Sequence, residues 1–151
     1  MVQIANSVWH QVVVTDPQGL SGASVASFVG PIIRELKAIA IVASDLVGAC
    51  SGLKGHERQV LSPDDFLRKA VDATQYDWAF FFLYSRVPKQ EELTGSDDKA
   101  AMLNADVTIR LADDQYFYVY SRDERLVSEV QLMYPAAEHK ASTFAELDIP
   151  Y

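Results

Sequence analysis

The chain has 151 residues, 49% of them apolar, and carries a formal net charge of −8. This composition is globular and excludes a disordered chain, and the length fits a single domain over residues 1–151. The acidic balance argues against nucleic acid or an anionic membrane as the main partner, because phosphate binding needs clustered Lys and Arg. It is compatible with a basic protein partner.

Cysteine content and hydropathy indicate the compartment. Cys50 is the one cysteine, so no intrachain disulfide can form. The first residues lack the basic region and apolar run of a secretory signal. The most apolar segment, 32–49, contains charged side chains and is not a membrane span. These features predict a soluble cytoplasmic protein.

The N-terminal segment predicts a strand followed by a helix. Residues 8–15 include three consecutive valines, which favours a strand covered on both faces, and the turn-forming residues 16–19 end it. A helix should follow, with Ser21 or Ser24 as its N-cap.

Gly30 and Pro31 then interrupt this helix, and Pro31 is expected at the first turn of a new one. The apolar residues from Pro31 to Ala43 recur at helical spacing. Residues 38–43 fit a buried strand equally well, because periodicity does not separate short apolar strands from helix ends. We favour the helix. Residues 48–55 contain three glycines and are expected to form a loop.

The centre of the chain predicts a well-capped helix and a core strand. Ser62 is an N-cap candidate, Pro63 suits the first helical position, and the acidic pair 64/65 complements the helix dipole. The aromatic run from Trp78 to Tyr84 predicts a central strand buried on both faces. The polar residues 87–98 predict a connection or a short helix.

The C-terminal third predicts a hairpin followed by a helix. Residues 106–121 alternate between apolar and polar side chains with a polar turn at 112–115, which is typical of a β-hairpin. Ser121 and Glu124 match a capping box, so a helix should run from there to Pro135. The tail 136–151 has little periodicity.

The length of the hairpin loop decides where Tyr116, Tyr118 and Tyr120 point. An even loop pairs Leu111 with Tyr116 and places the tyrosines on the aliphatic face. A three-residue loop pairs Ile109 with Phe117 and places them on the opposite, polar face. Because the turn contains no glycine, we favour the even loop and a tyrosine row within the core.

No residue pattern specifies a reaction, so we predict no catalytic residue, no cofactor and no metal site. Cys50 and His56 are close in sequence, but such proximity is common in non-catalytic proteins. His10 and His139 have no ligand-like neighbours at useful spacing. The paired acids at 64/65, 97/98, 113/114 and 123/124 are better explained by helix capping and turns.

We therefore expect an α+β fold, with a mostly antiparallel sheet of about four strands and two to four helices packed on it. The sheet should contain the N-terminal strand, the Trp78–Tyr84 strand and both arms of the hairpin.

For function we expect a small, non-enzymatic protein-interaction module, such as an inhibitor or immunity-type protein that neutralises a basic partner. The expected partner-binding residues are acids and tyrosines around the hairpin: Asp113, Asp114, Tyr116, Tyr118, Tyr120, Asp123 and Glu124. A homodimer is also compatible with an exposed hairpin edge. The alternative is a small enzyme or ligand-binding domain with a pocket between sheet and helices.

Overall fold

The computed structural model describes residues 7–49, 58–94 and 97–151. Its centre is a seven-stranded sheet in the order β3-β2-β4-β5-β6-β1-β7, in which every neighbouring pair is antiparallel. The strands are β1 (Trp9–Thr15), β2 (Ala40–Ala49), β3 (Gln59–Leu61), β4 (Gln75–Tyr84), β5 (Val107–Ala112), β6 (Tyr116–Ser121) and β7 (Glu138–Ser142). The α+β class is confirmed, whereas the expected number of strands is wrong.

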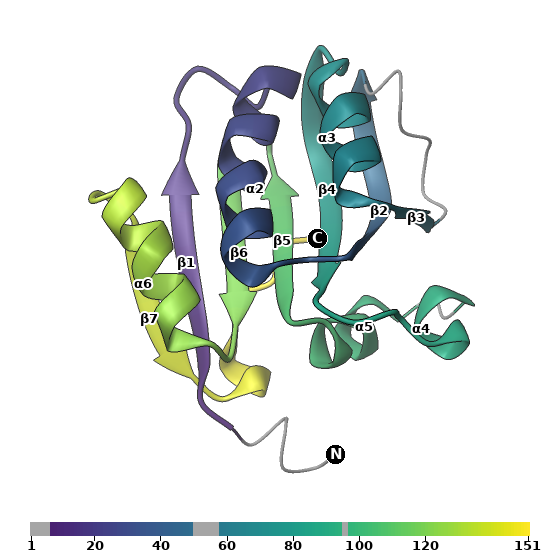
Figure 1. Cartoon of the computed structure of the whole chain (residues 1–151). Coiled ribbons are helices and arrows are strands. Elements are labelled where there is room, and N and C mark those ends of the chain that lie inside the picture. Colours follow the sequence, from purple (N-terminus) through teal and green to yellow (C-terminus); the bar gives the residue numbers. More distant parts are fainter. Residues whose placement is uncertain (1–6, 50–57, 95–96) are drawn as a thin grey trace.

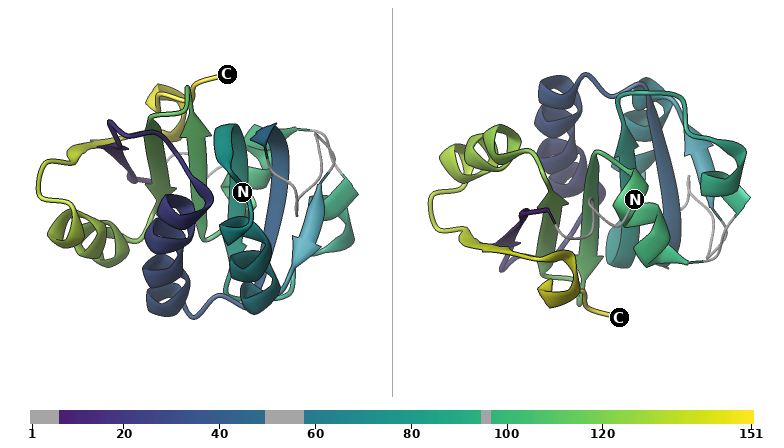
Figure 2. Two further views of the ribbon diagram at one scale, coloured as in Figure 1. Left: turned by 90° about the horizontal axis from the view of Figure 1, so that it is seen from above. Right: turned by 90° about the horizontal axis from the view of Figure 1, so that it is seen from below.

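The helices divide between the two faces of this sheet (Figures 1 and 2). They are α2 (Gly22–Leu36), α3 (Pro63–Val71), α4 (Gln90–Thr94), α5 (Asp98–Asn104) and α6 (Glu124–Met133), with a 3₁₀ turn η1 (Phe144–Glu146) near the C-terminus. The longer helices α2, α3 and α6 cover one face, and the C-terminal segment crosses the other face (Figure 2). None of the described helices is both long enough and apolar enough to cross a membrane.

Each face of the sheet has its own apolar core. The core beneath α2, α3 and α6 contains Phe28, Phe66 and Phe81, all buried. The core on the second face contains Phe80 and Phe82 and is closed by α5 and Leu147. Strand β4 therefore buries aromatic side chains on both sides, as its sequence predicts.

Residues 40–43 form a strand, so the helix expected there is wrong. Helix α2 ends at Lys37, which has a left-handed φ of 58° and donates its N–H to the carbonyl of Arg34. From Ala40 the chain pairs with β4, and from Ile41 with β3 as well. Ala40 and Val42 enter the second core, while Ile41 and Ala43 enter the first. A strand buries both sets of side chains, which one helix face does not.

Pro31 lies inside α2, so the expected break at Gly30–Pro31 is wrong. A proline in a helix interior costs about 3 kcal/mol. The same helix buries Phe28, Val29 and Ile32 against the sheet, and each apolar side chain contributes about 1.5–3 kcal/mol. This burial outweighs the cost of the missing N–H. The expected cap at Ser21 is confirmed, because its hydroxyl accepts the N–H of Ser24.

The cap of α6 lies two residues later than predicted. The carboxylate of Asp123 accepts the N–H groups of Arg125 and Leu126 at the helix start. Ser121 is the last residue of β6, and its hydroxyl accepts the N–H of Asp123 instead. The capping-box assignment is therefore wrong, and an acidic cap takes the place of the serine.

The hairpin β5–β6 has a three-residue loop, so the favoured even loop is wrong. Leu111 pairs with Phe117 and Arg110 pairs with Tyr118. Asp113 and Asp114 both adopt positive φ, 54° and 57°, a conformation that Asp tolerates better than most residues. Asp114 is also held by neighbours, because its N–H donates to Asp77 and its carboxylate accepts the N–H of Leu20. These bonds offset the strain for which glycine is usually needed.

Candidate functional site

The tyrosines of β6 lie on the second face of the sheet, beside Thr108 and Arg110. Tyr120 is fully buried, whereas Tyr116 and Tyr118 are partly exposed. The rings of Tyr116 and Tyr118 are 6.2 Å apart in an edge-to-face arrangement. The row of three tyrosines is thus open to solvent at Tyr116 and part of the core at Tyr120.

Strand register extends this row across four strands. Arg110 on β5 is opposite Tyr118 on β6, which is opposite Val13 on β1, which is opposite Glu138 on β7. Directly opposed residues of antiparallel strands share a face. We call Val13, Trp78, Tyr116, Tyr118 and Glu138 the open face. Its aromatic and aliphatic members are only partly buried.

Carboxylates lie close to the phenol groups of the open face. The pKa of Tyr118 is raised above its usual value, first by burial, then by Tyr116, and then by the carboxylates of Asp148 and Glu138. A negative charge near a phenol disfavours the phenolate form. The phenol of Tyr118 therefore lies within the influence of both carboxylates, and Nζ of Lys140 lies 3.7 Å from the carboxylate of Asp148.

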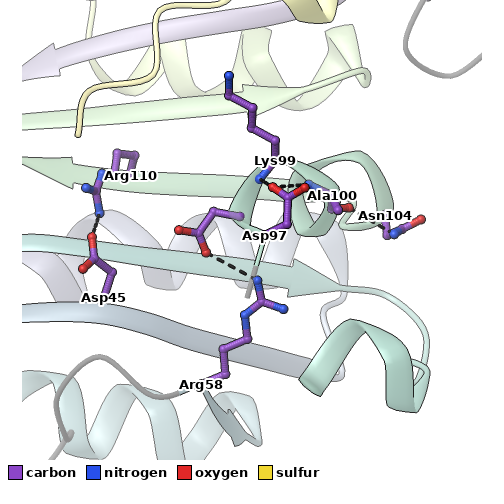
Figure 3. Close-up of polar contacts among 8 residues, drawn as sticks. Asp45, Arg58, Asp97, Lys99, Ala100, Asn104 and Arg110 are labelled. Carbon is purple, nitrogen blue, oxygen red and sulfur yellow. Dashed lines mark hydrogen bonds and ion pairs between the residues drawn. The ribbon is translucent and has the colours of Figure 1, made fainter. Parts of the chain in front are cut away.

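An ion pair between the buried Arg110 and the one-third-exposed Asp45 lies beside the open face. Arg110 is 1% exposed, and its Nη1 donates to the carboxylate of Asp45 across 2.9 Å, as Figure 3 shows. The guanidinium also stacks on the ring of Phe80, 4.0 Å from its centroid, and lies 4.9 Å from that of Trp78. Arg110 thus fixes the position of Trp78 on the open face.

A β-bulge directs Asp45 toward this arginine. Between the pairs Ser44–Phe80 and Val47–Trp78, β2 advances by one residue more than β4. Asp45 has a φ of 53° within this irregularity. Because an extra residue shifts the alternation of side chains, Asp45 shares the face of Arg110 while Leu46 returns to the helix side.

A second ion pair joins β3 to α5 on the same face. Nη2 of Arg58 lies 3.4 Å from the carboxylate of Asp98, and its guanidinium lies over the ring of Phe82. Figure 3 shows Arg58 reaching toward α5. Burial raises the pKa of the Asp98 carboxyl, and Arg58 lowers it by less. The net effect is a carboxylate that costs free energy to keep charged in the folded protein.

The C-terminal segment 143–151 is bound across the second face by polar side chains. The side-chain amide of Gln11 contacts both the N–H and the carboxylate of Asp148. Tyr120 donates its hydroxyl to the carbonyl of Asp148, and Arg110 donates Nε to the carbonyl of Pro150. Burial raises the pKa of Tyr120 far above its usual range, so this phenol remains a donor.

A cavity of about 350 Å³ lies between α5 and this C-terminal segment. It is lined mainly by apolar side chains, among them Phe144, Leu147 and Ile149, with Lys99 and Tyr151 as its polar members. Its volume falls in the range typical of small-ligand sites.

The acids proposed from sequence do not all lie near the open face. Asp113 is exposed in the hairpin turn, next to Tyr116. Asp114 binds the N–H of Leu20. Asp123 and Glu124 lie beyond the opposite end of β6, which spans about 17 Å at the usual rise per residue. The structure therefore brings Tyr116 and Tyr118 together and separates them from the α6 acids.

Sequence reasoning missed Asp45, Gln11 and Glu138. The one available signal was Arg110, since a charged residue within an apolar strand needs a partner when it is buried. That signal does not identify the partner, which is distant in sequence. Cys50 and His56, the nucleophile and base weighed from their proximity in sequence, lie outside the described residues.

Comparisons with known proteins found no relative. No family model matches the chain, and neither a curated protein nor a solved structure does. Among the described residues, no group of three or more His, Cys, Asp and Glu side chains is placed to hold a metal ion. Any functional assignment therefore rests on the geometry of the described residues.

Proposed function

We propose that the chain is a protein-interaction module that binds a basic segment of a partner protein on the open face. The observation that carries the proposal is the row Arg110, Tyr118, Val13 and Glu138, continuous across four strands. Partly exposed tyrosine and tryptophan are the side chains most enriched at interface hot spots. Here they stand on a rigid sheet, which lowers the entropy lost on binding.

The negative charges of the protein support the proposal that its partner is basic. Glu138 is exposed, and the side chain of Asp148 is 69% exposed, although it already forms an ion pair with Lys140 across 3.7 Å. The net charge of −8 adds a long-range attraction for cations. Arginine or lysine side chains of a partner could stack on Trp78 or Tyr118 while their charged groups meet these carboxylates. An inhibitor that neutralises a basic protein is one function of this class.

The test is affinity capture from the source organism with matched variants. Tyr116→Ser, Tyr118→Ser and Glu138→Lys together remove the aromatic groups and invert one charge on the open face. A control with Glu129→Lys and Leu132→Ser makes comparable changes at exposed positions of α6. We expect wild type and control to recover the same basic protein, and the open-face variant to lose it by at least tenfold (about 1.4 kcal/mol).

Circular dichroism spectra of the wild type and both variants should be the same, which shows that any loss of binding does not come from unfolding. Purified partner and chain should then bind more weakly as salt is raised, because exposed charges are screened. Equal recovery of every protein by all three variants would contradict the proposed surface.

A second candidate is binding of a small apolar ligand in the 350 Å³ cavity beside α5. Leu147→Trp would fill part of this space and leave Tyr116 and Tyr118 unchanged. Loss of a bound metabolite from this variant, with partner capture intact, would favour the ligand-binding function over the interaction module.

A further inference from the structure

Two histidines that are 129 positions apart in sequence meet at the edge of the sheet. In the β1–β7 register His10 is opposite Ala141, and Val12 is opposite His139, so the histidines are diagonal neighbours on one face. Nδ1 of His10 lies 3.0 Å from Nε2 of His139. The ring planes are inclined by only 27°. His10 is buried and His139 is exposed, so the contact between the two nitrogens is part-buried at the edge of the sheet.

The separation of these nitrogens matches two adjacent ligands of one metal ion. Metal–imidazole bonds are about 2.0–2.1 Å long, so ligands at a right angle are about 2.9 Å apart and ligands at a tetrahedral angle about 3.4 Å. The observed 3.0 Å is closer to the right angle. Right angles between ligands are typical of the tetragonal geometry of Cu²⁺ and Ni²⁺.

We propose that His10 and His139 bind one divalent late transition-metal ion, with Cu²⁺ bound most tightly, then Ni²⁺ and Zn²⁺. Imidazole is a preferred ligand of all three ions, and Cu²⁺ forms the most stable complexes in this series. The strands hold both rings in place before binding, which reduces the entropy cost. The net charge of −8 favours accumulation of cations at the surface.

The remaining coordination positions are filled by water. Among the described residues no third His, Cys, Asp or Glu joins the pair as a ligand group. The site is therefore open to solvent on the His139 side, and it would bind its ion reversibly. An open position of this kind also admits an external ligand such as a partner's histidine.

Metal binding requires one imidazole to change its tautomer, with no net loss of a proton and no redox step. In the metal-free pair one ring nitrogen carries a hydrogen and donates it to the lone pair of the other. When the ion binds, that hydrogen passes through solvent to the second nitrogen of the same ring. Each neutral imidazole then presents one lone pair to the metal, and the charge of the ion is retained.

The test is titration of the full chain with CuCl₂, NiCl₂ and ZnCl₂, followed by calorimetry and by the midpoint of thermal unfolding. A Cys50→Ser background removes the thiol as a competing ligand. We expect one equivalent of Cu²⁺ to bind and raise the midpoint. The electron paramagnetic resonance spectrum should be tetragonal and show splitting from two nitrogen ligands.

Single substitutions separate the site from the chain's third histidine. His139→Ala, on an exposed edge strand, and His10→Gln should each weaken Cu²⁺ binding by about tenfold or more, whereas His56→Ala should leave it unchanged. Binding that survives His139→Ala, or that is lost with His56→Ala, overturns the proposal. So does a wild-type protein that binds no Cu²⁺, because the histidines would then form a hydrogen-bonded pair only.

Discussion

At the scale of single residues, Arg110 links the interior to the open face. Its guanidinium is buried yet bonded to Asp45 and to the carbonyl of Pro150, and it stacks on Phe80. Removing one member of this ion pair lowers the free energy of unfolding, because the remaining charge then lacks a counter-charge in the protein interior. The pair also specifies geometry, since it holds β2, β5 and the C-terminal segment to one another. Arg110 thus contributes to both stability and the shape of the open face.

A double-mutant cycle should measure this link. We expect Arg110→Met to lower the free energy of unfolding by about 3 kcal/mol, since Asp45 and Pro150 lose the same donor group. Asp45→Asn should cost about 1–2 kcal/mol, because an amide oxygen still accepts from Arg110 but leaves the buried guanidinium without a counter-charge. Urea unfolding of the single and double variants should give a coupling of about 1–2 kcal/mol. Strictly additive losses would show that the two side chains act independently.

Asp98 should give the protein a distinctive pH dependence. Its pKa is raised in the folded state from an ordinary 3.8, mainly by burial. The folded protein then holds this proton more tightly than the unfolded chain does. The free energy of unfolding should therefore fall as pH rises from about 3.8 through the folded-state pKa.

Asp98→Asn cannot titrate, so this fall should disappear from urea-unfolding curves collected between about pH 4 and pH 7. Asp64→Asn, at an exposed position of α3, is the control and should follow the wild-type profile. If the wild-type and Asp98→Asn profiles remain parallel over the whole range, the burial of Asp98 has no consequence for stability.

At the scale of elements, close packing of α2 against the end of α3 depends on Gly22. A Cβ at this position would lie 2.3 Å from the carbonyl oxygen of Ala73 and 2.5 Å from that of Val71. The N–H of Gly22 also donates to Ala73, so the backbone cannot move away without losing this bond. Position 22, at the start of α2, is therefore restricted to glycine.

Two glycine substitutions in the same helix should have opposite effects. Gly22→Ala should lower the free energy of unfolding by about 1–3 kcal/mol through overpacking. In Gly30→Ala the nearest atoms to the new Cβ are 3.5 Å and 3.9 Å away, and both belong to side chains. The free energy of unfolding of this variant should rise by about 0.5–1 kcal/mol, because alanine is more favourable than glycine in a helix interior. The midpoints of thermal unfolding of both variants test this prediction. Equal shifts of the two midpoints would contradict it.

The elements that could be predicted from sequence are those whose signals are local. The valines of β1, the aromatic run of β4, the alternation of β5 and β6 and the Ser62 cap of α3 all follow from neighbouring residues. Strand β2 was missed because its apolar run is buried on both sides and has no period of its own. The hairpin register was missed because Asp114 depends on Asp77 and Leu20, which lie far away in sequence.

At the scale of the whole molecule, the candidate site depends on connections that local patterns do not contain. Tyr116 and Tyr118 were identified from the hairpin, but their surroundings come from β7, the β2 bulge and the segment 143–151. The exposed charges of β7 also have a structural effect, because Glu138, His139 and Lys140 make this edge strand a poor template for pairing with other chains. The same strand supplies Glu138 to the open face and His139 to the proposed metal site.

The position of β1 within the sheet has a consequence for biosynthesis. Among the described strands this one is synthesised before the other six, yet its partners are β6 and β7, which are synthesised after the other strands. Pairing between segments so distant in sequence is intrinsically slow. Val12 and Val14 therefore stay without their sheet partners during most of translation, which is a state that chaperones recognise and that favours aggregation. Synthesis of β6 and β7 is what allows β1 to enter the sheet between its two neighbours.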